Sequence, residues 1–114
     1  MSIFNKTDPR RSRLIRGIIL HLIWLAGNGD GLNPNDPFRM ARGVLTTALE
    51  GMQQLPNASD LVSAVRYCEE KGYVEVAWVN DGSGDFESLK LLVAGIDLVE
   101  STTTDPGVTI PKYR

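Results

Sequence analysis

The stretch from Asn57 to Val93 constrains the fold more than any other part of this chain. Asn57 is a residue type that caps helices, and the apolar residues after it recur at helical spacing until Lys71-Gly72, a typical helix end. Residues 73–79 are rich in β-branched and aromatic types, residues 80–85 favour turns, and residues 87–93 supply a second strand. The sequence therefore predicts a helix over 57–72 followed directly by a β-hairpin over 73–93.

Two longer helical patterns precede this stretch. Asp8-Pro9 and Asp36-Pro37 each place a capping residue before a proline, a combination that favours the start of a helix. We expect a first helix over 9–26 and a second over 36–54, with only Leu55-Pro56 between the second helix and Asn57. Two helices joined by so short a turn form a helix-turn-helix. The predicted class is mainly α with a small β-hairpin (α+β): a winged helix-turn-helix with three helices, a two-stranded wing and a short C-terminal helix.

The 114 residues suit one domain. We expect an N-terminal arm over 1–8, the winged helix-turn-helix domain over 9–101, and a C-terminal tail over 102–114 that lacks periodicity. The apolar run over 18–26 is too short to cross a membrane, and a single cysteine fits a reducing compartment, so a cytoplasmic protein without membrane contact is expected.

The first helix is apolar on two sides. Leu20, Ile23 and Trp24 project away from its expected core stripe on a helical wheel. Two alternatives are open for this second side: the C-terminal segment covers it, or it forms the interface of a homodimer. The stripe expected to face the core consists of Leu14, Ile15, Ile18, Ile19, Leu22 and Leu25.

Nothing in the sequence predicts catalysis, a metal site or a cofactor. His21 is the single histidine and lies in an apolar helix. The chain therefore lacks a histidine base for a nucleophile and a second histidine ligand for a metal. Cys68 falls on the expected buried side of the third helix. The loop over 27–35 resembles a calcium loop, but Leu32 stands where a ligand oxygen is required. We expect a protein that is not an enzyme.

The third helix carries the candidate contacts to DNA. Ser59, Ser63, Arg66 and Tyr67 lie away from its core stripe, and such residues can contact base edges and phosphates from the major groove. The second helix would present Arg39 and Arg42 to the backbone. The alternative is that both surfaces are simply solvated.

Charge is distributed unevenly. The net charge is −2, which does not indicate a nucleic-acid binder by itself, and the predicted wing is acidic. The first 16 residues are strongly basic, with one acidic residue, Asp8, against Lys6, Arg10, Arg11, Arg13 and Arg16.

Two segments resemble a known family. Residues 64–76, AVRYCEEKGYVEV, resemble the R-Y-L-E-x-x-G-L-V end of the recognition helix and first wing strand of many winged-helix regulators. Residues 89–100, LKLLVAGIDLVE, are similar to their L-T-x-x-G-I-x-L-L-E end of the wing and final helix. With Asp105-Pro106-Gly107-Val108, the pattern is similar to small ArsR-like winged-helix proteins of Mu-like phages and prophages. The cysteine pair of metal-responsive ArsR sensors is missing, so metal sensing is not implied.

Two functions remain open. The resemblance implies a transcriptional regulator of phage or prophage origin that binds double-stranded DNA as a homodimer. The alternative is a protein-interaction module, such as a phage assembly or packaging adaptor with a phage protein as its partner, that uses the same fold without touching DNA. The acidic wing favours the alternative, and the polar outer face of the third helix favours the regulator.

Overall fold

The computed structural model describes residues 8–29 and 34–111. Along these residues the chain forms four helices and one small antiparallel sheet, so the fold is α+β. The expected N-terminal arm, apart from Asp8, and the middle of the loop over 27–35 lie outside the described residues. None of the helices in the described part is long and apolar enough to cross a membrane. The helices are α2 (Pro9–Asn28), α3 (Arg42–Gly51), α4 (Ala58–Glu70) and α5 (Val93–Val99).

Local signals placed the starts of α2 and α4 and the end of α4 correctly. The Asp8 side chain accepts a hydrogen bond from the Arg10 amide and caps α2, with Pro9 as its first residue. Asn57 caps α4 in the same way through the Asp60 amide, at 2.8 Å. Gly72 follows α4 with φ +78°, a conformation that costs glycine little and other residues more. The predicted first and third helices are therefore confirmed.

The predicted second helix is wrong at its start. Residues Arg39–Ala41 form a strand, β1, and the helix after it, α3, begins only at Arg42. The Asp36 carboxylate does not cap a helix but accepts a hydrogen bond from Arg39 Nε at 3.0 Å. β1 is held by pairing with a strand about fifty residues later, which no local pattern can reveal.

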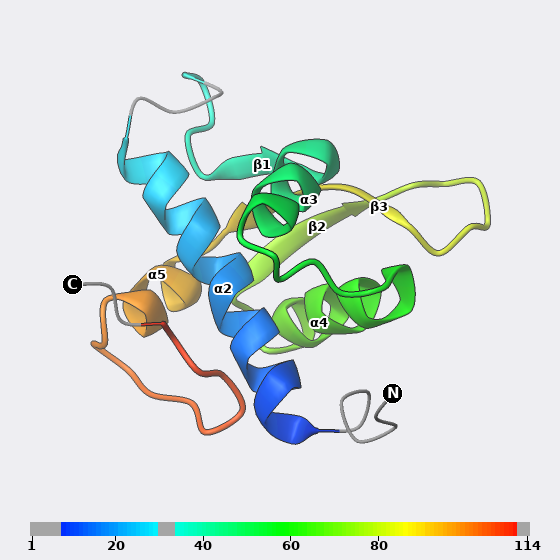
Figure 1. The fold of residues 1–114 in the computed structure, drawn as a ribbon. Helices are drawn as coiled ribbons and strands as arrows, with labels where there is room; N and C mark the ends of the chain where they lie inside the picture. Colours follow the sequence, from blue (N-terminus) through cyan, green and yellow to red (C-terminus); the bar gives the residue numbers. More distant parts are fainter. Residues whose placement is uncertain (1–7, 30–33, 112–114) are drawn as a thin grey trace.

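The sheet has three strands where the sequence predicted two. β2 (Val74–Trp78) and β3 (Phe86–Leu91) form the expected hairpin, and β1 adds to its other side in the order β1-β3-β2. Both pairings are antiparallel, and the register of the hairpin is irregular between Ala77 and Trp78. In Figure 1 the loop between β2 and β3 extends away from the body of the molecule.

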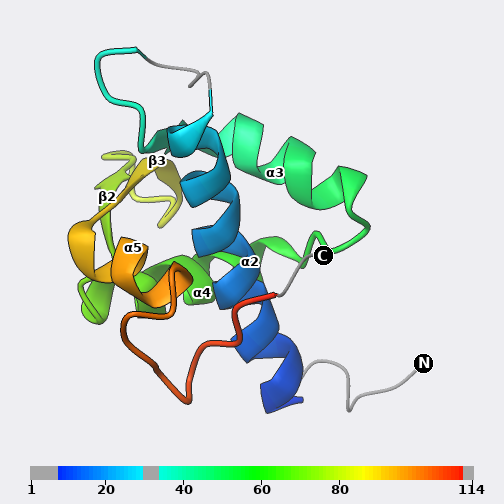
Figure 2. The same cartoon turned by 90° about the vertical axis from the view of Figure 1, so that its left-hand side faces the viewer.

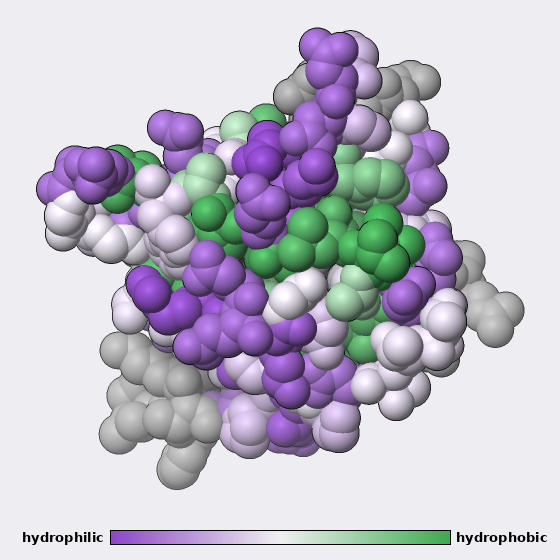
Figure 3. All heavy atoms as spheres, turned by 180° about the vertical axis from the view of Figure 1, so that it is seen from behind, coloured by the Kyte–Doolittle hydropathy of each residue, from purple (hydrophilic) through white to green (hydrophobic). Residues whose placement is uncertain are grey.

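The core lies between α2 and the other elements. In Figure 1, α2 runs down the middle of the molecule, with α5 on one side of its lower half and α4 on the other, and Figure 2 shows the sheet and α3 on opposite sides of its upper half. Leu61, Val65 and Cys68 of α4 are completely or almost completely buried against it, as their helical spacing predicted. The side away from α2 shows a hydrophobic band bordered by polar residues (Figure 3).

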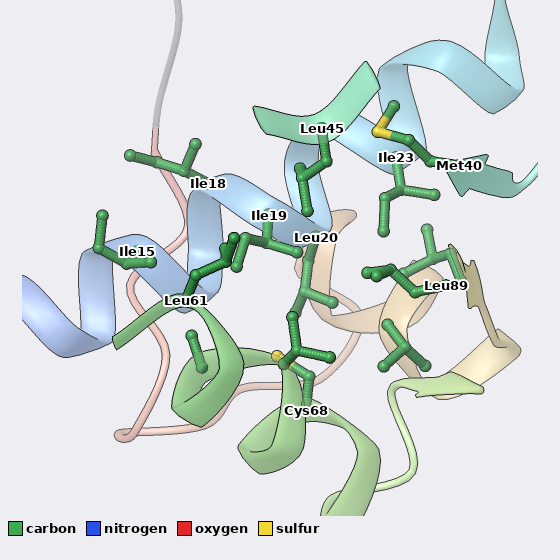
Figure 4. Close-up of a cluster of buried hydrophobic side chains, with 14 of the residues drawn as sticks. Ile15, Ile18, Ile19, Leu20, Ile23, Met40, Leu45, Leu61, Cys68 and Leu89 are labelled. Carbon is green, nitrogen blue, oxygen red and sulfur yellow. The ribbon is translucent and has the colours of Figure 1, made fainter. Parts of the chain in front are cut away.

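The predicted outer face of the first helix does not exist as an exposed surface. Leu20 and Ile23 are both 0% exposed, and Figure 4 shows them within the buried cluster beside Leu45 and Leu89. Trp24 is half-buried, and its indole Nε1 donates to Glu100 Oε2 at 2.9 Å. The expectation that Leu20 and Ile23 form a dimer interface is therefore wrong, because other elements of the same chain cover them, whereas Trp24 keeps part of its surface exposed. Leu25, expected in the core stripe, is instead 48% exposed.

The segment after α5 has no helix or strand, as expected, but it packs on α2. The Thr109 amide donates to the Arg13 carbonyl at 3.0 Å, and Arg16 Nη1 donates to the Gly107 carbonyl at 3.0 Å. Val108 is only 7% exposed. Figure 2 shows this segment, drawn orange to red, running back along the first half of α2.

An acidic side chain fixes this segment. Asp105, whose side chain is 6% exposed, accepts hydrogen bonds from the Tyr73 hydroxyl and the Gly107 amide and lies 3.7 Å from Lys71 Nζ. Burial would raise the pKa of Asp105, but the Tyr73, Gly107 and Lys71 contacts outweigh burial, and the pKa is lowered. The ionised carboxylate therefore ties residues 105–107 to the junction of α4 and β2.

Candidate nucleic-acid interface

The outer face of α4 is exposed as predicted. Burial of Leu61, Ala64, Val65 and Cys68 on one side turns the rest of the helix outward. Ser59, Ser63 and Arg66 are exposed in consequence. The serine side chains are short and the arginine side chain is flexible, so this surface of α4 can enter a groove of a nucleic acid.

Arg66 of α4 contacts the β2–β3 hairpin. Its guanidinium carbon is 4.6 Å from the centre of the Trp78 ring, a cation–π contact. The Trp78 indole Nε1 in turn donates to Glu69 Oε2 at 2.9 Å. The tryptophan thus fixes the position of β2 relative to α4 and restrains the arginine. The sequence placed Trp78 on a strand but gave no sign of its contact with Arg66.

Tyr67 does not belong to the outer face. Its ring is half-buried and lies under the Arg16 guanidinium, whose carbon is 3.7 Å from the ring centre. Lys71 Nζ lies 5.7 Å from the same ring. Tyr67 is also close enough to Gly107 that any side chain at that glycine would collide with the tyrosine hydroxyl. The prediction that Tyr67 faces a DNA groove is wrong, because the residue joins α4 to α2 and the C-terminal segment.

Arg39 and Arg42 are engaged within the chain. Arg39 lies on β1 rather than on a helix, and its guanidinium contacts Asp36 and the Ser88 hydroxyl, each at 3.0 Å. The hydrogen bond from Arg39 lowers the pKa of Asp36, so that pair is ionised at neutral pH. Arg42, the first residue of α3, donates from Nε to Asp85 Oδ1 at 2.9 Å. The structure does not bring these two arginines onto the outer face of α4.

The loop between β2 and β3 is acidic. It is built on Gly82 and Gly84, both with positive φ, and Asp81 accepts a hydrogen bond from the Ser83 amide. The contact with Ser83 lowers the pKa of Asp81, which therefore carries a full negative charge at neutral pH. The end of this loop and the first residues of α4 line a shared surface hollow, so the acidic loop flanks the α4 face.

The basic end of α2 lies on another side of α4. Arg10 is exposed and bonded to Asp8, and this hydrogen bond lowers the pKa of the aspartate. Arg11 is exposed and makes no ion pair with any residue in the described part of the chain. Both arginines line surface hollows that also include Asp60 near the start of α4. Free positive charge is therefore available beside α4, although the hairpin supplies none.

The described residues give little support for a metal site or for a catalytic thiol. Among residues 8–29 and 34–111, no three His, Cys, Asp or Glu side chains gather as a metal site would require. Cys68 is completely buried, and burial raises the pKa of its thiol to about 12. A thiol so placed is protonated and inaccessible, so it is not a nucleophile.

No family model, curated protein or solved structure matches this chain.

Proposed function

We propose that this chain is a winged helix-turn-helix protein that regulates transcription by binding double-stranded DNA through α4. The order of elements supports it: helix, strand, two helices, then a hairpin, with the first strand pairing to β3. In this reading α3 and α4 are the helix-turn-helix, joined by residues 52–57, α4 is the recognition helix, and the β2–β3 loop is the wing.

One observation carries the DNA proposal. The α4 face of Ser59, Ser63 and Arg66 is exposed, and Arg11 lies close to its first turn without an internal ion pair in the described part of the chain. A helix in the major groove needs short polar side chains that can approach base edges and cations that can reach the flanking phosphates. Ser59 and Ser63 supply the former, and Arg11 and Arg66 supply the latter.

The charges predict weak and salt-dependent binding. Asp60 and Glu70 are exposed on α4 itself, and they repel phosphates. If Arg11 and Arg66 contact phosphates, the logarithm of the binding constant should fall with the logarithm of salt concentration at a slope of about −2. We therefore expect detectable binding to any DNA duplex at low ionic strength and tighter binding to a preferred sequence.

The test is fluorescence anisotropy with a labelled duplex library over a series of salt concentrations. If Arg66 contacts a base, Arg66→Ala should weaken binding to the preferred sequence by about 1–3 kcal/mol. If Arg66 contacts a phosphate, the loss should be the same for all sequences. Lys90→Ala is the matched control, because it removes one positive charge from the sheet, where Lys90 pairs with Asp36 at 3.4 Å. Equal losses for the two variants, both folded by circular dichroism, would refute α4 as the DNA-binding face.

A second function has its own support. Arg39 and Arg42 are neutralised by carboxylates of the same chain, and the β2–β3 loop adds further negative charge. The hydrophobic band on the side away from α2 offers a surface suited to another protein (Figure 3). We propose as the alternative a protein-interaction module that uses this fold without DNA. Absence of any duplex binding at 50 mM salt would favour it over the regulator.

A further inference from the structure

A cavity lies between the first half of α2 and the start of α4. Its walls include Arg11, Ser12 and Arg16 of α2 and Asp60 and Ser63 of α4. The space open to the centres of water molecules is about 50 Å³. One water needs roughly 10–15 Å³ by this measure, so the cavity holds about four oxygen-sized groups, the number in a phosphate.

The polar groups around this cavity are donors with unused capacity. Neither the Ser12 nor the Ser63 hydroxyl makes a hydrogen bond within the described part of the chain, and Arg11 makes no ion pair there. The Nε of Arg16 is buried and finds no acceptor among the described residues, although its Nη1 donates to Gly107. A buried donor of a charged group is normally satisfied, so the Arg16 Nε suits an acceptor-rich ligand, and the exposed Arg11, Ser12 and Ser63 side chains can add donors from the rim of the cavity.

The charge of the cavity selects the sign of that ligand. Two guanidinium groups face one carboxylate, that of Asp60, so the lining carries a net positive charge. Arg16 is held in place by its stacking on Tyr67, which leaves little side-chain entropy to lose when a ligand binds. A cavity that combines one fixed arginine with a second arginine and two serine hydroxyls is suited to a tetrahedral oxyanion rather than to a cation or an apolar group.

We propose that this cavity is a phosphate-binding site, with Arg11 and Arg16 as the charged ligands and Ser12 and Ser63 as hydroxyl donors. Where the phosphate belongs to DNA, the inference rests on the proposed function: one backbone phosphate seated here would fix the position of α4 along the groove. A free phosphate ion shares the same chemistry and would use the same donors. Asp60 acts against either ligand and limits the affinity.

The first arm of the test uses inorganic phosphate and the full chain. A titration at constant ionic strength, followed by ¹H–¹⁵N amide shifts, should move the signals of Ser12 and Ser63. Arg11→Ala should weaken this binding about ten-fold, because it removes one charge-assisted contact. Asp60→Asn should strengthen it about three-fold by removing a like charge. Arg10→Ala is the control, since Arg10 is the exposed neighbour outside this cavity.

The second arm uses a DNA duplex and separates the two sources of phosphate. If a DNA phosphate occupies the cavity, Arg11→Ala reduces the salt slope by about 0.9 and Asp60→Asn tightens binding, while Lys90→Ala changes neither. Binding of inorganic phosphate without binding of any duplex supports the cavity with a free ion and overturns the proposed function. If neither substitution changes duplex binding and the protein does not respond to inorganic phosphate, the proposed phosphate site is refuted and α4 remains the DNA-binding face. If the protein binds neither probe, both proposals fail.

Discussion

Replacing Gly17 by alanine tests how the C-terminal segment is docked. Gly17 is a buried residue of α2, and a Cβ atom built on it would lie 1.7 Å from the Thr109 carbonyl oxygen and 2.5 Å from the carbonyl carbon. Both atoms belong to the backbone, so no change of rotamer relieves the collision. We expect Gly17→Ala to displace residues 108–110 from the helix.

The magnitude follows from what this segment contributes. Alanine is favoured over glycine inside a helix by about 1 kcal/mol. Displacement removes the hydrogen bond from Thr109 to the Arg13 carbonyl, worth about 1 kcal/mol, and exposes Val108, worth about 2 kcal/mol. The net result is a loss of about 2 kcal/mol of unfolding free energy.

Urea denaturation followed by circular dichroism measures this loss. Gly43→Ala is the matched control, because Gly43 is also helical but a Cβ atom there has no neighbour within 4 Å. The control should be unchanged or more stable by up to about 1 kcal/mol. A Gly17→Ala variant at least as stable as the wild type would show that the segment is not seated on α2.

Three further predictions concern stability. Ile23→Ala should cost about 2–5 kcal/mol in urea denaturation, because the side chain is completely buried within one chain; a loss that depends on protein concentration would instead indicate a subunit contact. Asn57→Ala should cost about 1 kcal/mol by removing the cap of α4, and Asn57→Asp should retain most of it; equal losses would exclude capping as the cause. The pKa of Asp105 is lowered in the folded state, so its contribution is complete above about pH 5 and is lost as pH falls below about 4. The difference in urea midpoint between wild type and Asp105→Asn should therefore shrink between pH 5 and pH 2, and a constant difference would refute the ionised contact.

The parts of the fold that were predicted correctly depend on neighbours in sequence. Asp8 and Asn57 cap helices whose first turns they adjoin, and Gly72 ends α4 by its own backbone conformation. The hairpin follows from alternating strand residues on both sides of a turn. In each case the stabilising contact lies within a few residues of the signal, so a local pattern is sufficient.

The errors concern contacts between distant residues. Met40 lies in a stretch with helical periodicity, yet it pairs with Leu89 and becomes part of a strand. A helical wheel showed that α2 has two apolar sides, but it could not show that Leu20 and Ile23 are covered by the same chain. Met40 is buried and Ala41 exposed in β1, but both residues are apolar, so the sequence carries no strand alternation at this point.

The candidate site was predicted in part for the same reason. The exposure of Ser59, Ser63 and Arg66 follows from the buried stripe of α4, which the spacing of apolar residues reveals. The placement of Arg42 depends on Asp85, 43 positions away, and the environment of Tyr67 depends on Arg16. Helical periodicity gives the direction of a side chain but not the partner that meets it there.

The docking of the C-terminal segment on α2 also constrains the order in which this protein can fold during synthesis. Arg16 and the Gly107 carbonyl that it contacts are 91 positions apart. A ribosome adds roughly 5–20 residues each second, so the first half of α2 leaves the exit tunnel several seconds before its cover is made. Throughout that interval the surface of α2 around Gly17, which the Thr109 carbonyl covers in the folded chain, stays open to water and to other nascent chains.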